Sequence, residues 1–237
     1  PAQLSASATA VATAPPTNRT TTETANTSRQ IDLVLVIDAT GSMAPELSQL
    51  QAGLAEAATG FSSLPGNPTL RYGLVLYRDL DKGESTQLFG LTNNWAQFAE
   101  NLTAVTAVGG GDYPEDVNNG LYQAVTSMDW QSEATKLVIL LGDAPPHSAN
   151  SAYPSLDETA VIAMERSITI YTIGSSGLDV ADAAAFQQLA QNHNGHFIYL
   201  ADIPGDVPAE ATAVYAPTDL PAVLVDIVAE TLNQPAP

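Results

Sequence analysis

The chain has 237 residues, with 7 basic and 26 acidic side chains that give a formal net charge of −19. This charge argues against binding to nucleic acid or to an anionic membrane surface, because both would repel it. The chain has no cysteine, which excludes disulfide bonds and every metal site built on thiolates. No apolar run approaches the ~20 residues of a membrane-spanning helix, so we expect no direct membrane insertion.

Residues 1–29 differ in composition from the rest of the chain. They are mostly Ala, Thr, Ser and Pro, with too few large apolar side chains to offset the entropy lost on ordering. We therefore predict a disordered linker or tail at 1–29 and one domain at 30–237. The length of the second part suits a single α/β domain with a substantial core.

From Ile31 onward, short apolar runs alternate with segments of helical periodicity. This alternation predicts an α/β fold, a doubly wound and mostly parallel sheet of six strands with helices on both faces. We expect the strands at Ile31–Ile37, Leu70–Tyr77, Gln87–Leu91, Leu137–Leu141, Ile168–Ile173 and His196–Leu200. Helical spacing follows the first strand from Leu47 to Phe61, precedes the fourth from Val117 to Met128, and closes the chain from Leu220 to Leu232.

Three loops beside these elements are rich in acids and hydroxyls. The first is Asp38-Ala39-Thr40-Gly41-Ser42, directly after the first strand, the second spans Gly109–Asp116, and the third spans Gly142–His147. Because ligands of a doubly wound sheet bind outside the carboxyl ends of its strands, we expect the three loops to converge there. Mg²⁺ takes about six oxygen ligands, usually several waters with one or two carboxylates. The loops therefore indicate a cation site built from hard oxygen ligands.

The main chemical alternative is an anion site. The start of the helix after Ser42 carries partial positive charge, which favours an anion unless nearby carboxylates outweigh it. The phosphate-binding pattern G-x-x-x-x-G-K-[ST] is absent, and the first loop contains no Lys or Arg. These absences favour the cation.

The loops resemble those of a known family. The first is similar to the metal-ion-dependent adhesion site of von Willebrand factor type A domains, D-x-S-x-S, with Thr40 in the first Ser place. The wider match is most similar to the A-like domain of integrin β subunits, whose N-L-D-x-P-E loop is followed from Gly110 to Glu115 with Gly110 in place of Asn. The Asp-Ala dipeptide of those domains, with a His three residues after the Ala, is matched by Asp143-Ala144 and His147.

The resemblance implies a Rossmann-like fold with one short antiparallel edge strand, and it implies roles for particular residues. Thr40, Ser42 and Glu115 would be direct metal ligands, and Asp38 and Asp143 would act directly or through water. The cofactor would be one divalent cation, Mg²⁺ in first place with Mn²⁺ or Ca²⁺ as alternatives. Its open coordination position would take an Asp or Glu of a protein partner.

The same family holds a second ion near the residue that corresponds to Asp112. Because Gly110 cannot supply the Asn oxygen of the family pattern, a second metal at Asp112 stays open.

The connection at about 201–218 is unusually long, and a long connection is uncommon unless it is functional. It follows the last expected strand, so it leaves from the edge that carries the metal loops. We hypothesise that it regulates the site and that Asp202, Asp206 or Glu210 occupies the open metal position. The alternative is a Pro-rich loop packed elsewhere.

Three functions follow from these observations. The first is a non-enzymatic, cation-dependent adhesion or protein-binding module, extracellular or on a cell surface, within a larger protein. The second is a structural or scaffold domain whose metal stabilises the loops. The third is a metal-dependent hydrolase or phosphotransferase, but the nucleophile pattern D-x-D-x-T is not met at Asp38, and neither G-x-S-x-G nor H-E-x-x-H occurs.

Overall fold

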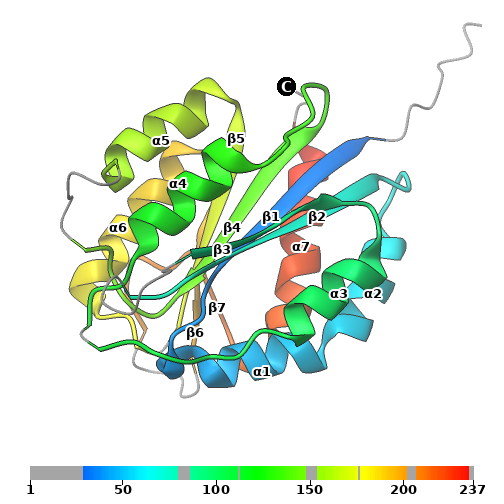
Figure 1. Cartoon of the computed structure of the whole chain (residues 1–237). Coiled ribbons are helices and arrows are strands. Elements are labelled where there is room, and N and C mark those ends of the chain that lie inside the picture. The colour runs from blue at the N-terminus through cyan, green and yellow to red at the C-terminus, as the bar shows by residue number, and fades with distance from the viewer. Residues whose placement is uncertain are drawn as a thin grey trace, which may run out of the picture.

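The computed structural model describes residues 29–79, 86–111, 113–147, 154–175, 177–201 and 207–234. All of the predicted tail except its last residue, Arg29, lies outside these ranges. Figure 1 shows the described elements from β1 in blue to α7 in red. The strands are β1 (Gln30–Asp38), β2 (Thr69–Tyr77), β3 (Thr86–Thr92), β4 (Thr135–Gly142), β5 (Ile168–Gly174), β6 (Phe197–Leu200) and β7 (Ala213–Tyr215). The helices are η1 (Gly41–Met43), α1 (Ala44–Ala52), α2 (Leu54–Ser62), α3 (Trp95–Thr103), α4 (Val117–Ser127), α5 (Leu156–Glu165), α6 (Val180–Asn192), η3 (Pro217–Asp219) and α7 (Leu220–Asn233).

The strands form one sheet in the order β3-β2-β1-β4-β5-β6-β7. Every pairing is parallel except that of β2 with the edge strand β3. The doubly wound, mostly parallel sheet and its antiparallel edge strand are thereby confirmed. In chain order β1 is followed by its neighbour on one side and later by β4 on the other, so the winding reverses between β1 and β4.

Within the described residues the sheet has seven strands, one more than expected. The extra strand, β7, lies within the stretch 201–218 that was expected to be a loop. It continues the sheet beside β6, with Ala201 N donating to Tyr215 O at 2.9 Å and Thr212 N donating to Phe197 O at 2.7 Å. Its three residues include one exposed valine, Val214, so no alternating pattern marked it in the sequence.

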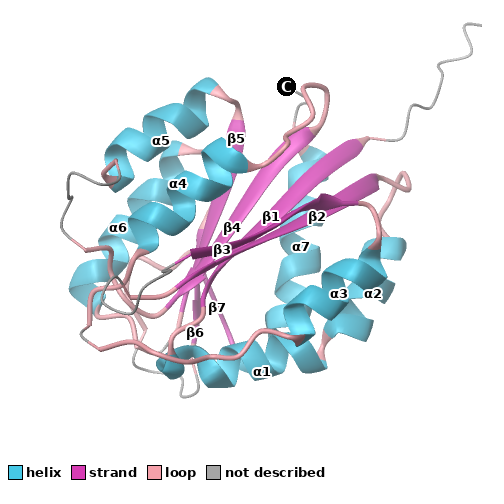
Figure 2. Cartoon of the chain, viewed as in Figure 1, coloured by secondary structure: helices cyan, strands magenta, loops and turns pink. Residues whose placement is uncertain are grey.

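Helices cover both faces of the sheet (Figure 2). Leu33, Leu35 and Ile37 of β1 belong to one core, which also contains residues of α1, α2, α3 and α7. Val34 and Val36 belong to a second core with α4, α5 and α6. Successive strand residues point to opposite faces, so burial on both faces requires the unbroken apolar run that the sequence shows.

The amphipathic stretch after β1 is divided at Gly53 into α1 and α2. A Cβ at Gly53 would lie 1.9 Å from Cγ of Pro221, near the start of α7. The division therefore lets α7 pack closely against the helix pair. The closing helix begins at Leu220 and ends at Asn233, close to its predicted bounds.

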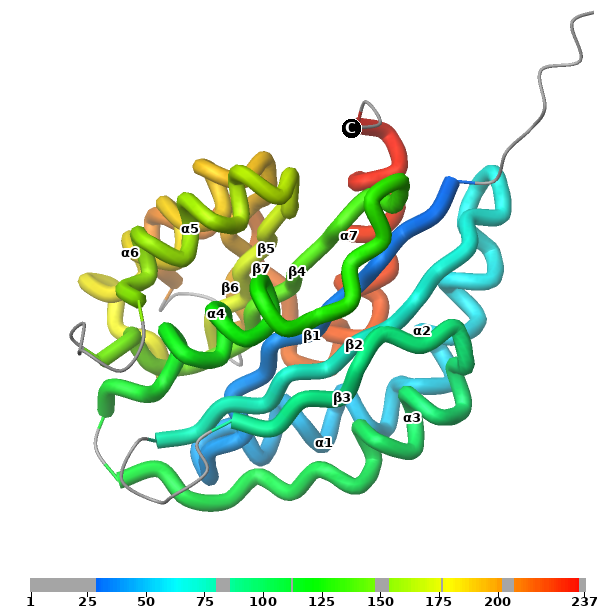
Figure 3. Tube along the Cα trace, turned by 45° about the horizontal axis from the view of Figure 1, so that its top comes forward, coloured from blue at the N-terminus to red at the C-terminus, as the bar shows by residue number. Residues whose placement is uncertain are grey.

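The described part of the chain begins and ends at the amino edge of the sheet, where Arg29 Nη1 donates to Leu232 O at 2.7 Å and to Gln234 O at 2.9 Å. In Figure 3 the start of β1 and the end of α7 accordingly lie at the same end of the molecule. The loops after β1 and β4 lie at the opposite, carboxyl edge.

Candidate metal centre

The first loop is shaped by hydrogen bonds to one carboxylate at the end of β1. Asp38 Oδ1 accepts from Thr40 N at 2.9 Å and from Thr40 Oγ1 at 2.7 Å, a local turn typical of Asp. The two hydroxyl oxygens, Thr40 Oγ1 and Ser42 Oγ, are 3.1 Å apart. The turn therefore places both hydroxyls of the predicted motif next to one another, above a carboxylate that is fully buried.

The second loop is joined to the first by two backbone hydrogen bonds. Val108 N donates to Ala39 O at 2.9 Å, and Gly41 N donates to Gly109 O at 3.1 Å. Gly110 has a φ of 82°, which favours glycine. A Cβ there would lie 3.2 Å from both Glu115 Oε1 and Thr40 Cβ. Gly110, which the resemblance treats as a departure, thus permits close contact between the two loops.

Glu115 joins the second loop to the third. Its N–H donates to Pro145 O at 3.0 Å, and its carbonyl accepts from His147 N at 3.1 Å, while its side chain is buried. The ring of His147 turns to Asp79, with Nε2 3.2 Å from Oδ1. Asp112 lies outside the described residues, so a second metal there stays a prediction.

Asp143 follows β4 directly and completes the set. Its carboxylate accepts a hydrogen bond from the side chain of Ser42. The side chains of Asp38, Thr40, Ser42 and Asp143 therefore form one row across the ends of the adjacent strands β1 and β4. Thr40 donates to Asp38 and Ser42 donates to Asp143, and the two hydroxyl oxygens lie in contact between them. The row lies at the point where the winding of the sheet reverses, which is where ligands bind in such sheets.

A hollow of about 350 Å³ opens above this row. Its lining includes Ser42, Glu115 and Asp143, together with four glycines and Tyr113. Asp38 and Thr40 do not line the hollow and are almost fully buried. The structure therefore brings four of the five predicted ligands into one row, with Glu115 and two members of that row lining the hollow.

Burial dominates the electrostatics of the centre. It raises the pKa of Asp38 from 3.8 to about 7, against the lowering effect of the hydrogen bonds from Thr40. The charge of Asp143 raises the pKa of Asp38 further, and Arg78 lowers it. The pKa of Asp143 is itself raised by burial. Both carboxyls are thus harder to ionise than in water, a condition that a bound cation would relieve.

One oxygen of the centre bears directly on whether a cation fits. Asp38 Oδ2 is buried and has no hydrogen-bond partner among the residues that the structure describes. Across the same residues, no three His, Cys, Asp or Glu side chains lie together as a metal-binding group. A cation here would therefore need the hydroxyls and water as well as carboxylates, which is the ligand mixture that Mg²⁺ prefers.

Of the three acids of the long connection, the structure describes Glu210, which does not line the hollow. Asp202 and Asp206 fall outside the described residues. Glu210 is absent from the lining of the hollow, and its carbonyl accepts from Nε2 of Gln187, within α6, at 2.9 Å. Occupation of the open metal position by an acid of this loop stays a prediction, with no support from the position of Glu210.

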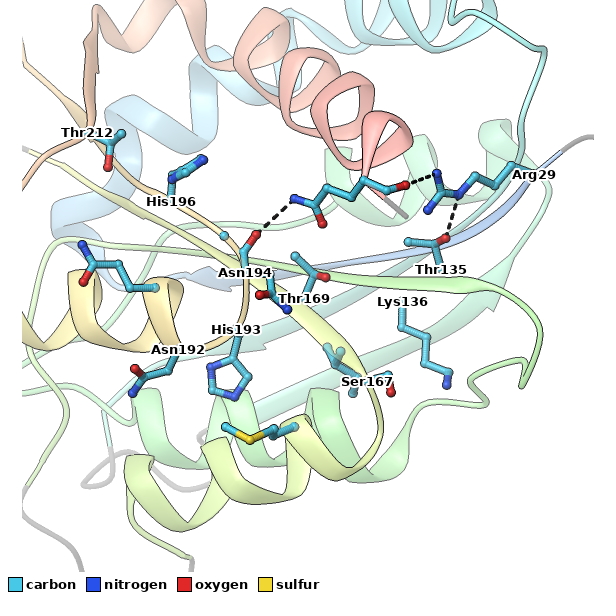
Figure 4. A pocket seen from close by; sticks show the side chains of 15 residues that line it. Arg29, Thr135, Lys136, Ser167, Thr169, Asn192, His193, Asn194, His196 and Thr212 are labelled. Atoms are coloured by element: carbon cyan, nitrogen blue, oxygen red, sulfur yellow. Dashed lines mark hydrogen bonds between the residues drawn. The ribbon is translucent and has the colours of Figure 1, made fainter. Parts of the chain in front are cut away.

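A second hollow, of about 950 Å³, lies at the amino edge (Figure 4). Its basic groups are engaged within the protein. Arg29 Nε donates to Thr135 Oγ1 at 3.1 Å, Lys136 Nζ donates to Arg166 O at 3.0 Å, and both ring nitrogens of His193 lie 2.8 Å from backbone carbonyls. These contacts join parts of the fold, so the carboxyl edge is the better candidate site.

Sequence reasoning missed one wall of the carboxyl-edge hollow. Gly177, in the loop after β5, lines it, and the Tyr113 hydroxyl accepts from Asp179 N in the same loop at 2.7 Å. The stretch between β5 and Asp179 contains no acid, so a search for metal ligands passes over it. The available signal was its place after a parallel strand, at the shared edge.

Substitution of Gly177 tests how tightly Asp143 is held. A Cβ at this position would lie 2.9 Å from both Cβ and Oδ2 of Asp143, so Gly177→Ala should displace the carboxylate. We expect the Mg²⁺ affinity to fall about tenfold in a calorimetric titration. Gly90→Ala, which meets nothing within 4 Å, is the control, and equal Mg²⁺ affinities of the two variants would contradict the expectation.

The sequence and the fold are similar to those of known proteins. Residues 32–209 match the family model of the von Willebrand factor type A domain. A stretch of 137 residues is 28% identical to the alpha-protein kinase vwkA of Dictyostelium discoideum, covering 55% of this chain and 22% of the kinase. The chain thus spans less than a quarter of that relative's length.

Solved structures give the same fold. A von Willebrand factor type A protein from Catenulispora acidiphila aligns with a TM-score of 0.61 and 17% identity, over 88% of this chain and 44% of that one. The open conformation of the pilus adhesin SpaC from Lactobacillus rhamnosus GG aligns with a TM-score of 0.60 and 15% identity, over 86% and 30%. At these identities the likeness concerns the fold alone.

Proposed function

The chain belongs to the von Willebrand factor type A domain family, and from this we propose that it is a non-enzymatic module that binds a protein partner through one divalent cation. The cation is Mg²⁺ in first place, with Mn²⁺ or Ca²⁺ as alternatives. Domains of this family generally serve in protein interaction, and the metal dependence is the specific part of the proposal.

The observation that carries the proposal is the buried, unsatisfied oxygen of Asp38. Oδ2 has no hydrogen-bond partner within the described ranges, although a buried carboxylate oxygen normally has one. It belongs to a row in which Asp38 is linked through Thr40 and Ser42 to Asp143. A cation that shares this row would neutralise the buried charge and supply the missing interaction.

The residues of the row have separate tasks in this function. Ser42 and Thr40 offer neutral oxygens, Glu115 and Asp143 offer charge, and Asp38 orients the Thr40 hydroxyl through its hydrogen bond. When bound, the cation supplies a Lewis-acidic position that accepts a carboxylate oxygen. The chain has a net charge of −19, which repels an acidic partner residue. The positive charge of the cation would offset this repulsion locally.

The scaffold alternative uses the same metal without a partner at it, and the hydrolase alternative requires a nucleophile or base that acts on a substrate. No geometric feature of the described centre favours the hydrolase over the binding module. The kinase relative does not alter this balance, because the chain covers 22% of that protein.

Location and context follow from the same proposal. An adhesion module of this kind belongs outside the cell or at its surface, as part of a larger protein. Throughout the described ranges, the helices are too short or too polar to cross a membrane.

Metal binding should depend on pH, because protons compete for the carboxylates. With the pKa of Asp38 raised to about 7, the carboxyl must lose its proton before it can interact with a cation. We expect the Mg²⁺ affinity to rise by up to about tenfold per pH unit below that pKa and to level off above it. Calorimetric titrations at several pH values check this, and an affinity independent of pH would contradict it.

The experiment for the function itself combines metal titration with capture. Immobilised protein is exposed to cell-surface extract in Mg²⁺ and then washed with EDTA. Release of a retained protein by EDTA, and its return with Mg²⁺, supports the binding module. Mg²⁺ binding with retention that ignores EDTA would favour the scaffold, and a native protein that binds no divalent cation would refute the metal reading.

A further inference from the structure

Three exposed apolar side chains lie on the segments that border the metal hollow and form what we call the apolar rim: Val108, Tyr113 and Val180. Their exposed fractions are 50%, 40% and 54%. Six large apolar side chains are at least 40% exposed across the described ranges, so three of the six lie at this edge. Large apolar side chains that are exposed close to one another mark interaction surfaces.

The rim is held in place by the loops that build the centre. Tyr113 lines the hollow, and its hydroxyl accepts from Asp179 N at 2.7 Å, which fixes the ring against the residue before Val180. Val108 precedes the lining residue Gly109, and its N–H donates to Ala39 O at 2.9 Å. These hydrogen bonds hold the segments that carry Val108 and Tyr113, and Val180 directly follows the residue that Tyr113 contacts.

Glycines form the parts of the hollow's lining that lie between the rim residues. Gly109, Gly111 and Gly177 line the hollow and are exposed. Without side chains they leave backbone groups accessible to an extended segment that enters the hollow. A folded partner with a convex surface would reach fewer of these backbone groups than an extended peptide would.

Charge beside the rim restricts the partner further. Asp179 precedes Val180, and the side chain of Asp182 shares a hydrogen bond with the Tyr113 hydroxyl. With these acids and a net charge of −19, additional carboxylates next to the one at the metal would be repelled. Apolar side chains next to that carboxylate in the partner would instead be favoured, because they would cover the apolar rim.

We propose, building on the function proposed above, that the partner is an extended peptide segment with a single carboxylate flanked by apolar side chains that pack on Val108, Tyr113 and Val180. The carboxylate supplies the metal-dependent contact, and the flanking side chains supply specificity. Segments rich in Asp and Glu are rejected.

The test uses a displayed library of short peptides with a fixed central Asp and randomised flanking residues. Clones are retained by the native protein in Mg²⁺ and eluted with EDTA. We expect enrichment of Leu, Ile, Val and Phe at the flanks and depletion of Asp and Glu. The double variant Val108→Ser/Val180→Ser should bind a selected peptide about tenfold more weakly. Val161→Ser, an equally exposed valine on α5, is the matched control and should leave binding unchanged.

Three results would overturn the inference: eluted clones without apolar enrichment, equal peptide affinity of the double variant and the native protein, or no clones that depend on Mg²⁺. A calorimetric Mg²⁺ titration of the native protein and the double variant separates this failure from failure of the proposed function. If the native protein binds Mg²⁺, the inference about the partner fails alone. If it does not, the metal-dependent function fails with it.

Discussion

Asp38→Asn is expected to lower the Mg²⁺ affinity by about 100-fold and, in the absence of metal, to make the folded protein more stable at neutral and higher pH. The two effects share a cause, the full burial of this carboxylate. Removing its charge removes an interaction with the cation and also removes the cost of an ionised group in the interior.

The direction of the stability effect follows from the pKa of Asp38, which is 3.8 in the unfolded chain and about 7 in the folded protein. A carboxyl whose pKa is higher in the folded than in the unfolded protein stabilises the folded state fully below the unfolded pKa. This contribution is lost as the pH rises through about 7. Once ionised, the metal-free carboxylate costs on the order of 4 kcal/mol. Asn cannot ionise, yet its side-chain oxygen can still accept the hydrogen bonds from Thr40.

Urea unfolding in EDTA, at one pH below the unfolded pKa and one above the folded pKa, measures this effect. We expect the variant to exceed the native protein in stability only at the higher pH. Asp226→Asn, on the exposed side of α7, makes the same charge change away from the centre and should alter neither Mg²⁺ affinity nor this pH dependence. Native-like Mg²⁺ affinity of Asp38→Asn would contradict the assignment.

The second large effect concerns a buried ion pair near the amino edge. Arg71 Nε and Nη2 donate to Asp32 Oδ1 and Oδ2 at 2.8 and 2.6 Å, and Gln131 N also donates to Oδ2, at 2.8 Å. Asp32 is fully buried. We expect Arg71→Met to lower the free energy of unfolding by about 3–5 kcal/mol, because it leaves an unpaired buried carboxylate. Chemical denaturation measures the loss.

Lys136 provides the matched control. Asp32 has two cross-strand neighbours, Arg71 on β2 and Lys136 on β4. The ammonium group of Lys136 donates to Arg166 O. Lys136→Met removes the same charge and should cost less than about 1 kcal/mol. Asp32→Leu added to Arg71→Met should recover most of the loss. A loss for Lys136→Met as large as that for Arg71→Met would mean that general charge balance, and not the pair, is responsible.

The inner strands were predictable because both of their faces are buried. An unbroken apolar run such as Ile31–Ile37 has few other interpretations, and β1 extends it by one residue at each end. β7 was not predictable in this way, since its three residues take their place from backbone pairing with β6. The position of Glu210 depends on that pairing and on α6, so the sequence could not place it.

The candidate site was likewise predictable only in part. Asp38, Ser42 and Asp143 could be grouped from sequence because each lies at or just after the end of a strand at the same edge. The burial of Asp38 and the packing of Gly177 against Asp143 depend on contacts between distant loops. The metal itself stays a prediction from the residues, supported by the row of oxygen ligands and by the unsatisfied oxygen of Asp38.

The central claim is that one divalent cation binds at this row, and anomalous diffraction from a crystal of the protein grown with Mn²⁺ tests it most directly. The account predicts one strong anomalous peak at roughly 2.2 Å from Ser42 Oγ and from at least one more oxygen of Thr40, Glu115 or Asp143. An anomalous map with no peak at the row, or with its Mn²⁺ bound elsewhere, would contradict the account.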